Sequence, residues 1–482
     1  MPDGTYPTQE KNIAKPARVF SVYCRYTRTH PWLTTTIVVG MLLVQAGGLV
    51  APLYLRQFFN VLAAGPTARS FSALMLTLAL LGAIWLINWL GYRLQDTASA
   101  YLESRVRARL LSDSFEYLLG HSYDFFLSNF AGSLTSKVGK YARAYETLFS
   151  LAVTQMAPMV IYVGGAVIIL FVRNAALGAI LAVWSIAFIV FQLWLAKLRW
   201  PKREERSAAD TRVTAALADA IGNQSTIAVF SGAKDEQQRF DSTVDRWRDL
   251  AWGLWRFDSW VWAALGLFTV AVEVALLGAA AFYWQRGELT VGDFILIESY
   301  LLTTITALMG INYQIRNFYD ALADAGEMVY LLDLPHSVAD VNGAVPLCVT
   351  EGRIVFDEVV FYFRETRPIL QKFSLTIAPG EKAALVGPSG AGKSTLLKLL
   401  LRLYDVSGGK IEIDGMRLSH ATQDSVRESV GFVPQEPILF HRTLMENIRY
   451  GRRDATDEEV IDAARRAHCD KFIDVLPEGY NT

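Results

Sequence analysis

Residues 385–400, LVGPSGAGKSTLLKLL, decide how the C-terminal part of this sequence folds. A glycine-rich loop joins an apolar run typical of a buried strand to an apolar run typical of a helix, and residues 387–394 match G-x-x-x-x-G-K-S/T in full. Glycines let the backbone curl so that successive N–H groups point inward at phosphate oxygens, with the positive end of a helix behind them. The stretch therefore predicts an α/β domain with a phosphate-binding loop.

Each residue type in this loop suits a nucleotide. Lys393 adds a positive charge for the β- and γ-phosphates, and the Ser394 hydroxyl is a ligand for Mg²⁺. Thr395 adds a hydrogen bond to a nearer phosphate. We therefore expect ATP and Mg²⁺ here, and the expected contact residues are Gly387, Pro388, Ser389, Gly390, Ala391, Gly392, Lys393, Ser394 and Thr395.

The sequence before this domain has the composition of a membrane protein. Of the 482 residues 52% are hydrophobic and only 19% are charged, and the apolar excess lies before about residue 316. Spanning a bilayer takes roughly 20 apolar residues. Six windows meet this length: 33–55, 71–92, 147–172, 174–196, 259–285 and 289–315. The sequence thus predicts a six-helix membrane domain followed by an α/β domain.

The distribution of Lys and Arg predicts the orientation of these spans. Five precede the first window, seven lie in 93–146 and eleven in 197–258, whereas 56–70, 173 and 286–288 hold two, one and one. By the positive-inside rule the N-terminus, both long loops and the phosphate loop are cytoplasmic. We expect a multi-pass protein of the plasma membrane, in contact with the lipid bilayer.

Whole-chain charge and cysteine usage exclude other classes of protein. The net charge of −1 gives no reason to expect a nucleic acid partner. The three cysteines are widely separated, so we expect free thiols and no cysteine–histidine metal site.

The windows and linker-like stretches divide the chain into four parts. Residues 1–32 form a cytoplasmic N-terminus, in which 16–29 suit a short helix at the membrane surface or a solvated helical turn. Residues 33–330 form the membrane domain, whose spans we expect to extend into the cytoplasm. Residues 331–352, rich in Pro, Gly and small residues, form a linker, and 353–482 the nucleotide-binding part.

The α/β domain has further recognisable segments. Alternating apolar and polar residues from Gly352 predict an antiparallel β element before the loop, and 409–415, GKIEIDG, predict a strand and turn. GFVPQ at 431–435 predicts a strand with Gln435 at its end, where the side chain either touches Mg²⁺ or the attacking water or is a plain loop glutamine.

With six spans and long cytoplasmic loops, then GPSGAGKST, IEIDG, VGFVPQEPILF and ENIRYG in this order, the chain resembles an ATP-binding cassette (ABC) exporter half-transporter of the multidrug and lipid exporter type. The resemblance runs from about Pro16 to Thr482. It implies the type IV transmembrane fold and a second half-transporter, identical or different, as partner.

The resemblance also implies roles for several residues. Gln435 matches the Q-loop glutamine that senses Mg²⁺ and the γ-phosphate, and residues 122–131 and 221–230 match the two coupling helices. Phe363 stands where the family has the tyrosine that stacks on adenine, with Tyr362 as the rival. Phenylalanine is a departure from the family pattern, although its ring also stacks.

The family's signature LSGGQ, its Walker B aspartate with the catalytic glutamate, and its switch histidine do not occur in these residues. We therefore expect a C-terminally truncated chain that binds ATP, with no catalytic residue of its own beyond assistance from Lys393 and Gln435. The resemblance implies ATP-driven export of an amphipathic substrate, such as a drug, lipid or peptide, by the full-length protein. An ATP-binding regulatory or channel-like membrane protein without turnover is the alternative.

Glu273 falls near the middle of the fifth window, where an ionisable side chain is costly. It is either a substrate or proton contact in a central cavity or a carboxyl group held between helices, and the sequence leaves both open.

Overall fold

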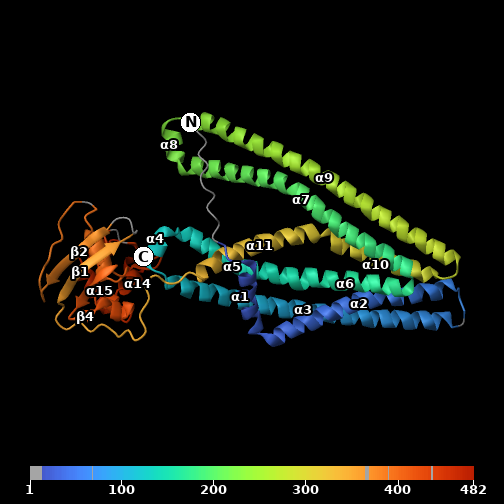
Figure 1. Cartoon of the computed structure of the whole chain (residues 1–482), viewed down its shortest axis with the longest axis horizontal. Helices are drawn as coiled ribbons and strands as arrows, with labels where there is room; N and C mark the ends of the chain where they lie inside the picture. Colours follow the sequence, from blue (N-terminus) through green and yellow to red (C-terminus); the bar gives the residue numbers. More distant parts are fainter. Residues whose placement is uncertain (1–12, 68, 364–367, 389, 436–437) are drawn as a thin grey trace. The chain divides into compact units, whose positions relative to one another are not determined.

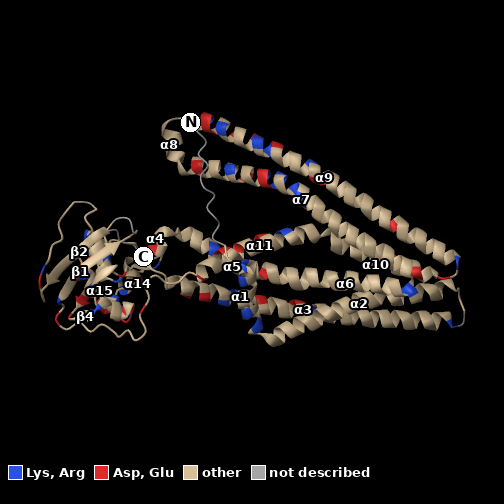
Figure 2. Cartoon of the chain, in the orientation of Figure 1, with Lys and Arg blue, Asp and Glu red and all other residues tan. Residues whose placement is uncertain are grey.

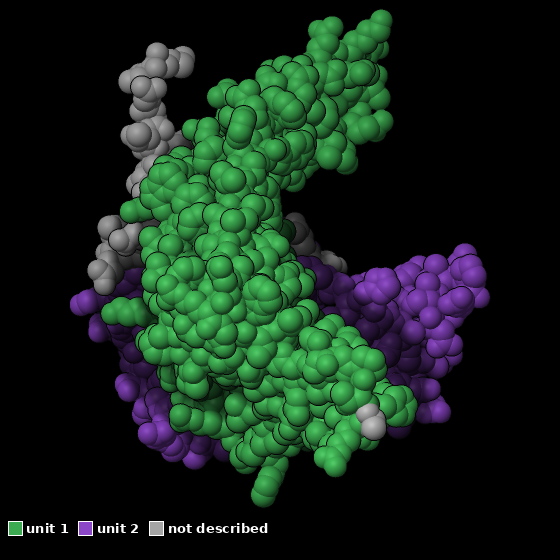
Figure 3. All heavy atoms as spheres, turned by 90° about the vertical axis from the view of Figure 1, so that its right-hand side faces the viewer, with its two compact units in different colours: residues 1–121, 125–335 green, residues 122–124, 336–482 purple. Residues whose placement is uncertain are grey.

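The computed structural model describes residues 13–67, 69–363, 368–388, 390–435 and 438–482. The chain divides into two compact units, coloured separately in Figure 3. Unit 1 comprises residues 1–121 and 125–335, and unit 2 comprises residues 122–124 and 336–482. The division therefore falls inside the expected linker, at Pro335.

Six helical segments of unit 1 are long and apolar enough to cross a membrane, which confirms the six predicted spans. Each is longer than its apolar window, because polar helical turns continue beyond the hydrophobic part. Along the chain the helices before residue 333 are α1 (Pro16–Arg28), α2 (Pro31–Ala63), α3 (Ser70–Leu119), α4 (Tyr123–Ser128), α5 (Ala131–Ser150), a π-helical turn η1 (Leu151–Met156), α6 (Ala157–Arg173), α7 (Ala175–Gly222), α8 (Gln224–Val229), α9 (Ala233–Gln285), α10 (Val291–Met309) and α11 (Ile311–Leu332) (Figure 1).

Most charged residues of the long helices lie outside the predicted apolar windows. Figure 2 shows long uncharged stretches in the membrane-spanning helices, with Lys, Arg, Asp and Glu clustered on the helical extensions and at the opposite turns. The pattern matches an apolar belt between two aqueous ends.

Small residues let α2 and α3 pack closely. A Cβ atom on Gly40 would lie 2.7 Å from the carbonyl oxygen of Gly91, and one on Gly47 would lie 2.8 Å from the Asn88 amide nitrogen. That amide donates to the carbonyl oxygen of Val44 at 3.0 Å. Close backbone approach with polar cross-links is the usual way in which helices associate in lipid.

Two spans are not single regular helices. The third consists of α5, η1 and α6, and the sixth is interrupted at Gly310 between α10 and α11. The sequence predicted continuous helices for both, because apolar composition carries no information on local helix register.

The pair α7–α9 diverges from the other helices of unit 1 toward α8 and converges with them at the opposite end (Figure 1). Near that end, Trp184 of α7 donates to the carbonyl oxygen of Phe268 of α9 at 3.0 Å. The two turns expected to hold coupling helices do contain short helices, α4 and α8.

The helix predicted at 16–29 is α1, and it packs on α11, α2 and α3. Val19 and Tyr23 are buried in this contact, and the Tyr23 hydroxyl donates to the carbonyl oxygen of Tyr141 at 2.7 Å. The alternative of a solvated turn is therefore wrong.

Unit 2 contains a four-stranded antiparallel sheet in the order β2-β1-β3-β4. Phe356 on β1 is opposite both Leu375 on β2 and Ile411 on β3, so one face forms the core against α12. The antiparallel element and the IEIDG strand predicted from sequence are confirmed. The strands are β1 (Ile354–Tyr362), β2 (Pro368–Ile377), β3 (Gly408–Ile413) and β4 (Met416–Arg417).

Two predicted strands are absent from the described part of unit 2. Residues 383–386 before the phosphate loop, and 431–435 ending at Gln435, are not in strands, and their valines Val386 and Val433 are 89% and 92% exposed. A strand is stable only when neighbouring strands satisfy its N–H and C=O groups, and neither run belongs to the described sheet. Both predictions are therefore wrong for this structure.

The remaining elements of unit 2 are short. The helix after the phosphate loop ends earlier than its apolar run, because the backbone at Arg402 turns left-handed with φ of 48°. The helices are α12 (Lys393–Leu400), η2 (Leu418–His420), α13 (Gln423–Glu428), α14 (Leu444–Arg449), α15 (Asp457–Arg466), α16 (Asp470–Ile473) and η3 (Gly479–Asn481).

Candidate functional site

The phosphate loop has the backbone that its sequence predicts. Gly390 and Gly392 have φ of 84° and 88°, conformations that side chains disfavour, and Gly392 is the N-cap of α12. A Cβ atom on Gly392 would lie 3.2 Å from Leu370 and 3.3 Å from Ile369 of β2. The torsion therefore favours glycine here, and the two neighbours leave little room for a side chain.

Lys393 lies across this loop. Its ammonium group donates to the carbonyl oxygens of Gly387 at 2.7 Å and Pro388 at 2.8 Å. The charge is thus held at the mouth of the loop by two neutral acceptors, for which an anionic oxygen would be a stronger replacement.

The other expected contact residues differ in their surroundings. Ser394 is exposed, whereas Thr395 is buried beneath the loop. Gln435 is exposed, and no hydrogen bond among the described residues joins it to the loop. Ser389 lies outside the described residues.

The loop fits a magnesium–nucleotide complex by its donor chemistry. Ser394 supplies a hydroxyl and Gln435 an amide oxygen, both ligands that Mg²⁺ accepts beside phosphate oxygens. Within the described residues there is no cluster of three or more His, Cys, Asp or Glu that would hold a metal by itself. A bound Mg²⁺ would neutralise phosphate charge at this loop.

Phe363 follows the end of β1 and is 47% exposed. Its ring lies edge-on to Phe361 at 4.9 Å and to Tyr404 at 5.3 Å between ring centroids. Burial and the neighbouring Asp124 raise the pKa of Tyr404 to about 12, so this aromatic support stays uncharged. Tyr362 is 38% exposed, so exposure does not separate the two candidates for stacking on adenine.

A second polar site lies inside unit 1. Helices α7, α9, α10 and α11 line a cavity of about 360 Å³ at the predicted cytoplasmic end of the spans. The Arg199 guanidinium, 8% exposed, lies 2.9 Å from the Asp258 carboxylate. Arg203 and Arg316 form no ion pair with any described residue, so the cavity carries uncompensated positive charge. Its lining residues are Gln192, Arg199, Arg203, Asp258, Trp262, Leu265, Met309, Gly310, Asn312, Tyr313 and Arg316.

Polar side chains without charge complete this cavity. The Asn312 amide donates to Gln192, which joins α11 to α7. The amide oxygen of Asn312 is buried and has no hydrogen-bond partner among the described residues. A ligand in the cavity would therefore meet the amide oxygen of Asn312, a hydrogen-bond acceptor, as well as the guanidinium groups of the arginines.

Sequence reasoning missed the arginines of this cavity. A signal was present, because Gln192, Arg199 and Arg203 are separated by seven and then four residues and therefore share one helix face. Glu273, the intramembrane carboxylate that the sequence singled out, is half-buried on α9 and does not line this cavity.

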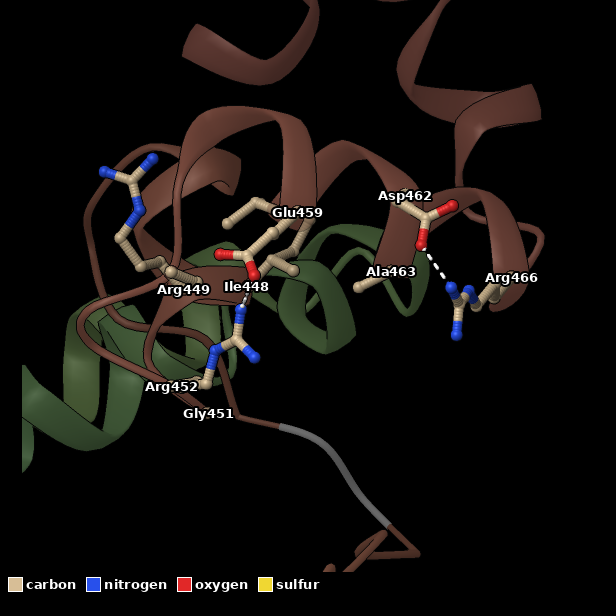
Figure 4. Close-up of a pocket in the computed structure, with 10 residues that line it drawn as sticks. Ile448, Arg449, Gly451, Arg452, Glu459, Asp462, Ala463 and Arg466 are labelled. Atoms are coloured by element: carbon tan, nitrogen blue, oxygen red, sulfur yellow. Dashed lines mark ion pairs between the residues drawn. The ribbon is translucent and has the colours of Figure 1, made fainter.

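An open cavity of about 540 Å³ between α14 and α15 also contains arginines (Figure 4). Arg452 is directed at Glu459, at 2.5 Å, and Arg466 at Asp462, at 2.7 Å. Arg449 pairs with Asp457. Because each guanidinium already has a carboxylate partner, this cavity is a poor anion site.

A buried carboxylate lies at the opposite end of unit 1. Asp293, 1% exposed, lies 2.6 Å from Arg56 of α2 and 2.8 Å from Arg173 of α6. The cluster joins three helices at the end distant from the arginine-lined cavity.

Comparison with known proteins accounts for both units. Residues 34–308 match the family model of the ABC transporter transmembrane region, and residues 370–479 match the ABC transporter model. The chain belongs to the ABC transporter family. This confirms the resemblance and the fold class, a six-helix membrane domain followed by an ABC nucleotide-binding domain.

This ABC transporter is similar to proteins of one exporter group. It is 34% identical to an ATM1-type heavy metal exporter of Novosphingobium aromaticivorans over 401 residues, 81% of this chain and 63% of the relative. It is 31% identical to the mitochondrial iron-sulfur clusters transporter atm1 of Aspergillus fumigatus, over 81% of this chain and 54% of the relative. The chain thus spans less than two thirds of either protein.

A solved structure has the same fold. A bacterial Atm1-family ABC exporter with ATP bound aligns with a TM-score of 0.77 and 29% identity, over 94% of this chain and 80% of that one. The comparison supports a multi-pass ABC exporter fold.

Proposed function

We propose that this chain is the membrane and nucleotide-binding part of an ATP-driven exporter that works as a dimer of half-transporters. ATP with Mg²⁺ binds at the phosphate loop, with Lys393 as its principal cation and Gln435 and Ser394 on the metal. The membrane is the plasma membrane, with the N-terminus and unit 2 in the cytoplasm, as the distribution of Lys and Arg predicts. The extended spans carry α4 and α8 as coupling helices.

The cargo is an anion. The observation that carries this proposal is the cavity in unit 1, where, among the described residues, Arg203 and Arg316 have no acidic partner and Arg199 pairs only with Asp258. Uncompensated guanidinium groups beside apolar helices favour a ligand with carboxylate or other anionic groups, since Arg binds such groups bidentately. A neutral or cationic amphipathic drug would leave these charges unpaired, so this proposal narrows the amphipathic cargo expected from the sequence to anions.

The relatives narrow the class of anion. Their names refer to heavy metals and iron–sulfur clusters. Soft metals and such clusters are held by thiolates, and their complexes with acidic thiols carry net negative charge. An acidic metal–thiolate complex therefore agrees with the positive charge of the cavity and with the names of the relatives.

The test measures ATP hydrolysis by the full-length protein in lipid nanodiscs, with three cargo probes. These are the Hg²⁺ complex of mercaptosuccinate, which is anionic, the Hg²⁺ complex of 2-mercaptoethanol, which is neutral, and rhodamine 6G, an amphipathic cation. We expect stimulation by the anionic complex alone. Stimulation of ATP hydrolysis by rhodamine 6G alone would support a cationic amphipathic cargo and contradict an anionic one. Tight ATP binding without turnover under every condition would favour the regulatory alternative.

A further inference from the structure

A buried arginine stands at the far end of the helix that follows the phosphate loop. Arg402 is 2% exposed and comes directly after Leu401, the C-cap of α12. The opposite end of the same helix begins with Gly392 and Lys393. Arg402 is therefore joined to the nucleotide site by a single short helix.

The Arg402 guanidinium has four acceptors. It donates to the carboxylates of Asp340 at 3.0 Å and Asp405 at 3.2 Å, and to the carbonyl oxygen of Ala339 at 3.0 Å. The fourth acceptor is the carbonyl oxygen of Ala421. A buried cation is stable only when its donors are satisfied in this way. Two of the four acceptors, Ala339 and Asp340, belong to the linker at 331–352.

The linker beyond Asp340 is fixed to the same unit. Val345 donates to His420 at 3.1 Å and accepts from Thr422 at 3.0 Å, both between backbone groups. The backbone N–H of Leu347 donates to the Ser425 hydroxyl at 2.8 Å. This part of the linker is thus an ordered strap on unit 2, although its composition predicts a loop.

The start of the linker is fixed within unit 1. Asp333, the C-cap of α11, accepts from the Arg18 guanidinium at 3.0 and 3.2 Å, and this partner lowers the pKa of the Asp333 carboxyl. The carbonyl oxygen of Leu334 accepts from the Tyr117 hydroxyl at 2.6 Å. Each end of the linker is therefore held by its own unit.

We propose that Arg402 is a positioning residue that transmits nucleotide binding at the start of α12 to the linker. This inference rests on the proposed function, because it requires ATP at the phosphate loop. Coupling between distant sites is carried by rigid elements and hydrogen-bond networks. Helix α12 is the rigid element here, and the Arg402 network connects its C-terminal end to Ala339 and Asp340.

Two carboxylates on the same guanidinium provide a matched pair of variants. Asp340 and Asp405 both accept from Arg402 and are similarly exposed, at 37% and 41%, but only Asp340 is on the linker. Asp340→Asn weakens the connection to the linker, including the bonds that Asp340 accepts from Gln423, and Asp405→Asn weakens the bond of Arg402 within the α12–β3 connection. Neither residue is among the expected nucleotide contacts.

The experiment measures amide hydrogen exchange of residues 338–347 in the purified chain in lipid nanodiscs, with and without ATP and Mg²⁺. ATP affinity is measured in parallel with a fluorescent nucleotide. We expect ATP to slow exchange in this segment by about fivefold or more in the wild type and in Asp405→Asn, a typical coupling factor. In Asp340→Asn the effect should be lost while ATP affinity changes by less than about twofold.

Each outcome bears on a different claim. Equal responses of the segment in both variants, or no response in a wild type that binds ATP, would overturn the role of Arg402 and leave the proposed function intact. A wild-type chain that does not bind ATP contradicts the proposed function and removes this inference with it.

Discussion

The ammonium group of Lys393 lies 2.7 Å from the carbonyl oxygen of Gly387, so this cation is held across the phosphate loop by the loop's own backbone. The same loop backbone is expected to bind the nucleotide's phosphates. Replacing Lys393 with alanine removes the charge without a bulky substitute.

Lys393→Ala should weaken ATP binding about 10- to 100-fold, because a hydrogen bond to a charged group contributes about 1.5–3 kcal/mol. Equilibrium binding of a fluorescent ATP analogue to the purified chain measures this. Lys382→Ala, an exposed lysine before the loop, is the control and should bind ATP like the wild type. Equal affinities for the two variants would show that the nucleotide binds elsewhere.

Phe363→Ala should reduce ATP affinity about tenfold, since stacking of a base on an aromatic ring contributes about 1–3 kcal/mol. Tyr362→Ala should have a smaller effect. A triphosphate that lacks a base separates lost stacking from indirect damage to the site. The wild type should bind ATP more tightly than this triphosphate, whereas the Phe363 variant should bind the two ligands with similar affinity. A larger loss in the Tyr362 variant would reverse the assignment.

Arg316→Ala should weaken binding of the mercaptosuccinate–Hg²⁺ complex about tenfold or more, because one charge-assisted contact is lost. Tryptophan fluorescence can follow the titration, since Trp262 lines the same cavity. Arg212→Ala, on an exposed part of α7, is the control, because it removes the same single positive charge from a residue that does not line the cavity. The prediction fails if both variants lose affinity equally.

Asp293→Asn should destabilise the membrane domain by about 3 kcal/mol, because two guanidinium groups lose their shared buried carboxylate. The measurement is the midpoint of thermal unfolding in nanodiscs. Glu288→Gln changes an exposed carboxylate near the same turn and should leave the midpoint unchanged. An unchanged midpoint in the Asp293 variant would mean that the cluster contributes no net stability.

Asp414 should make the turn at 350–353 resistant to acid. Four backbone N–H groups of this turn donate to its carboxylate and hold its pKa well below the usual range. Since the folded-state pKa is lowered, the stabilisation is complete above the ordinary Asp pKa of about 3.9 and is lost as pH falls through the lowered value. Amide exchange of this turn should therefore stay slow down to about pH 4 in the wild type and become fast in Asp414→Asn. Glu351→Gln, whose backbone N–H donates to Asp414, is the control and should behave like the wild type.

Local sequence features sufficed for much of this protein. Six apolar windows determined six spans, because a bilayer imposes a length and a composition on any helix that crosses it. The glycine pattern at 387–394 determined the loop, since Gly390 and Gly392 must adopt torsions that other residues avoid. Alternation of apolar residues likewise determined β1, β2 and β3.

Only the tertiary structure decided which distant residues meet. Arg199 reaches Asp258, Arg402 reaches Asp340, and Asp293 collects Arg56 and Arg173, because helix packing and chain reversal bring together positions with no local relation. The runs at 383–386 and 431–435 show the same principle in reverse. Their residues favour strands, but a strand forms only where neighbouring chain accepts its hydrogen bonds, and that depends on the fold and not on the segment itself.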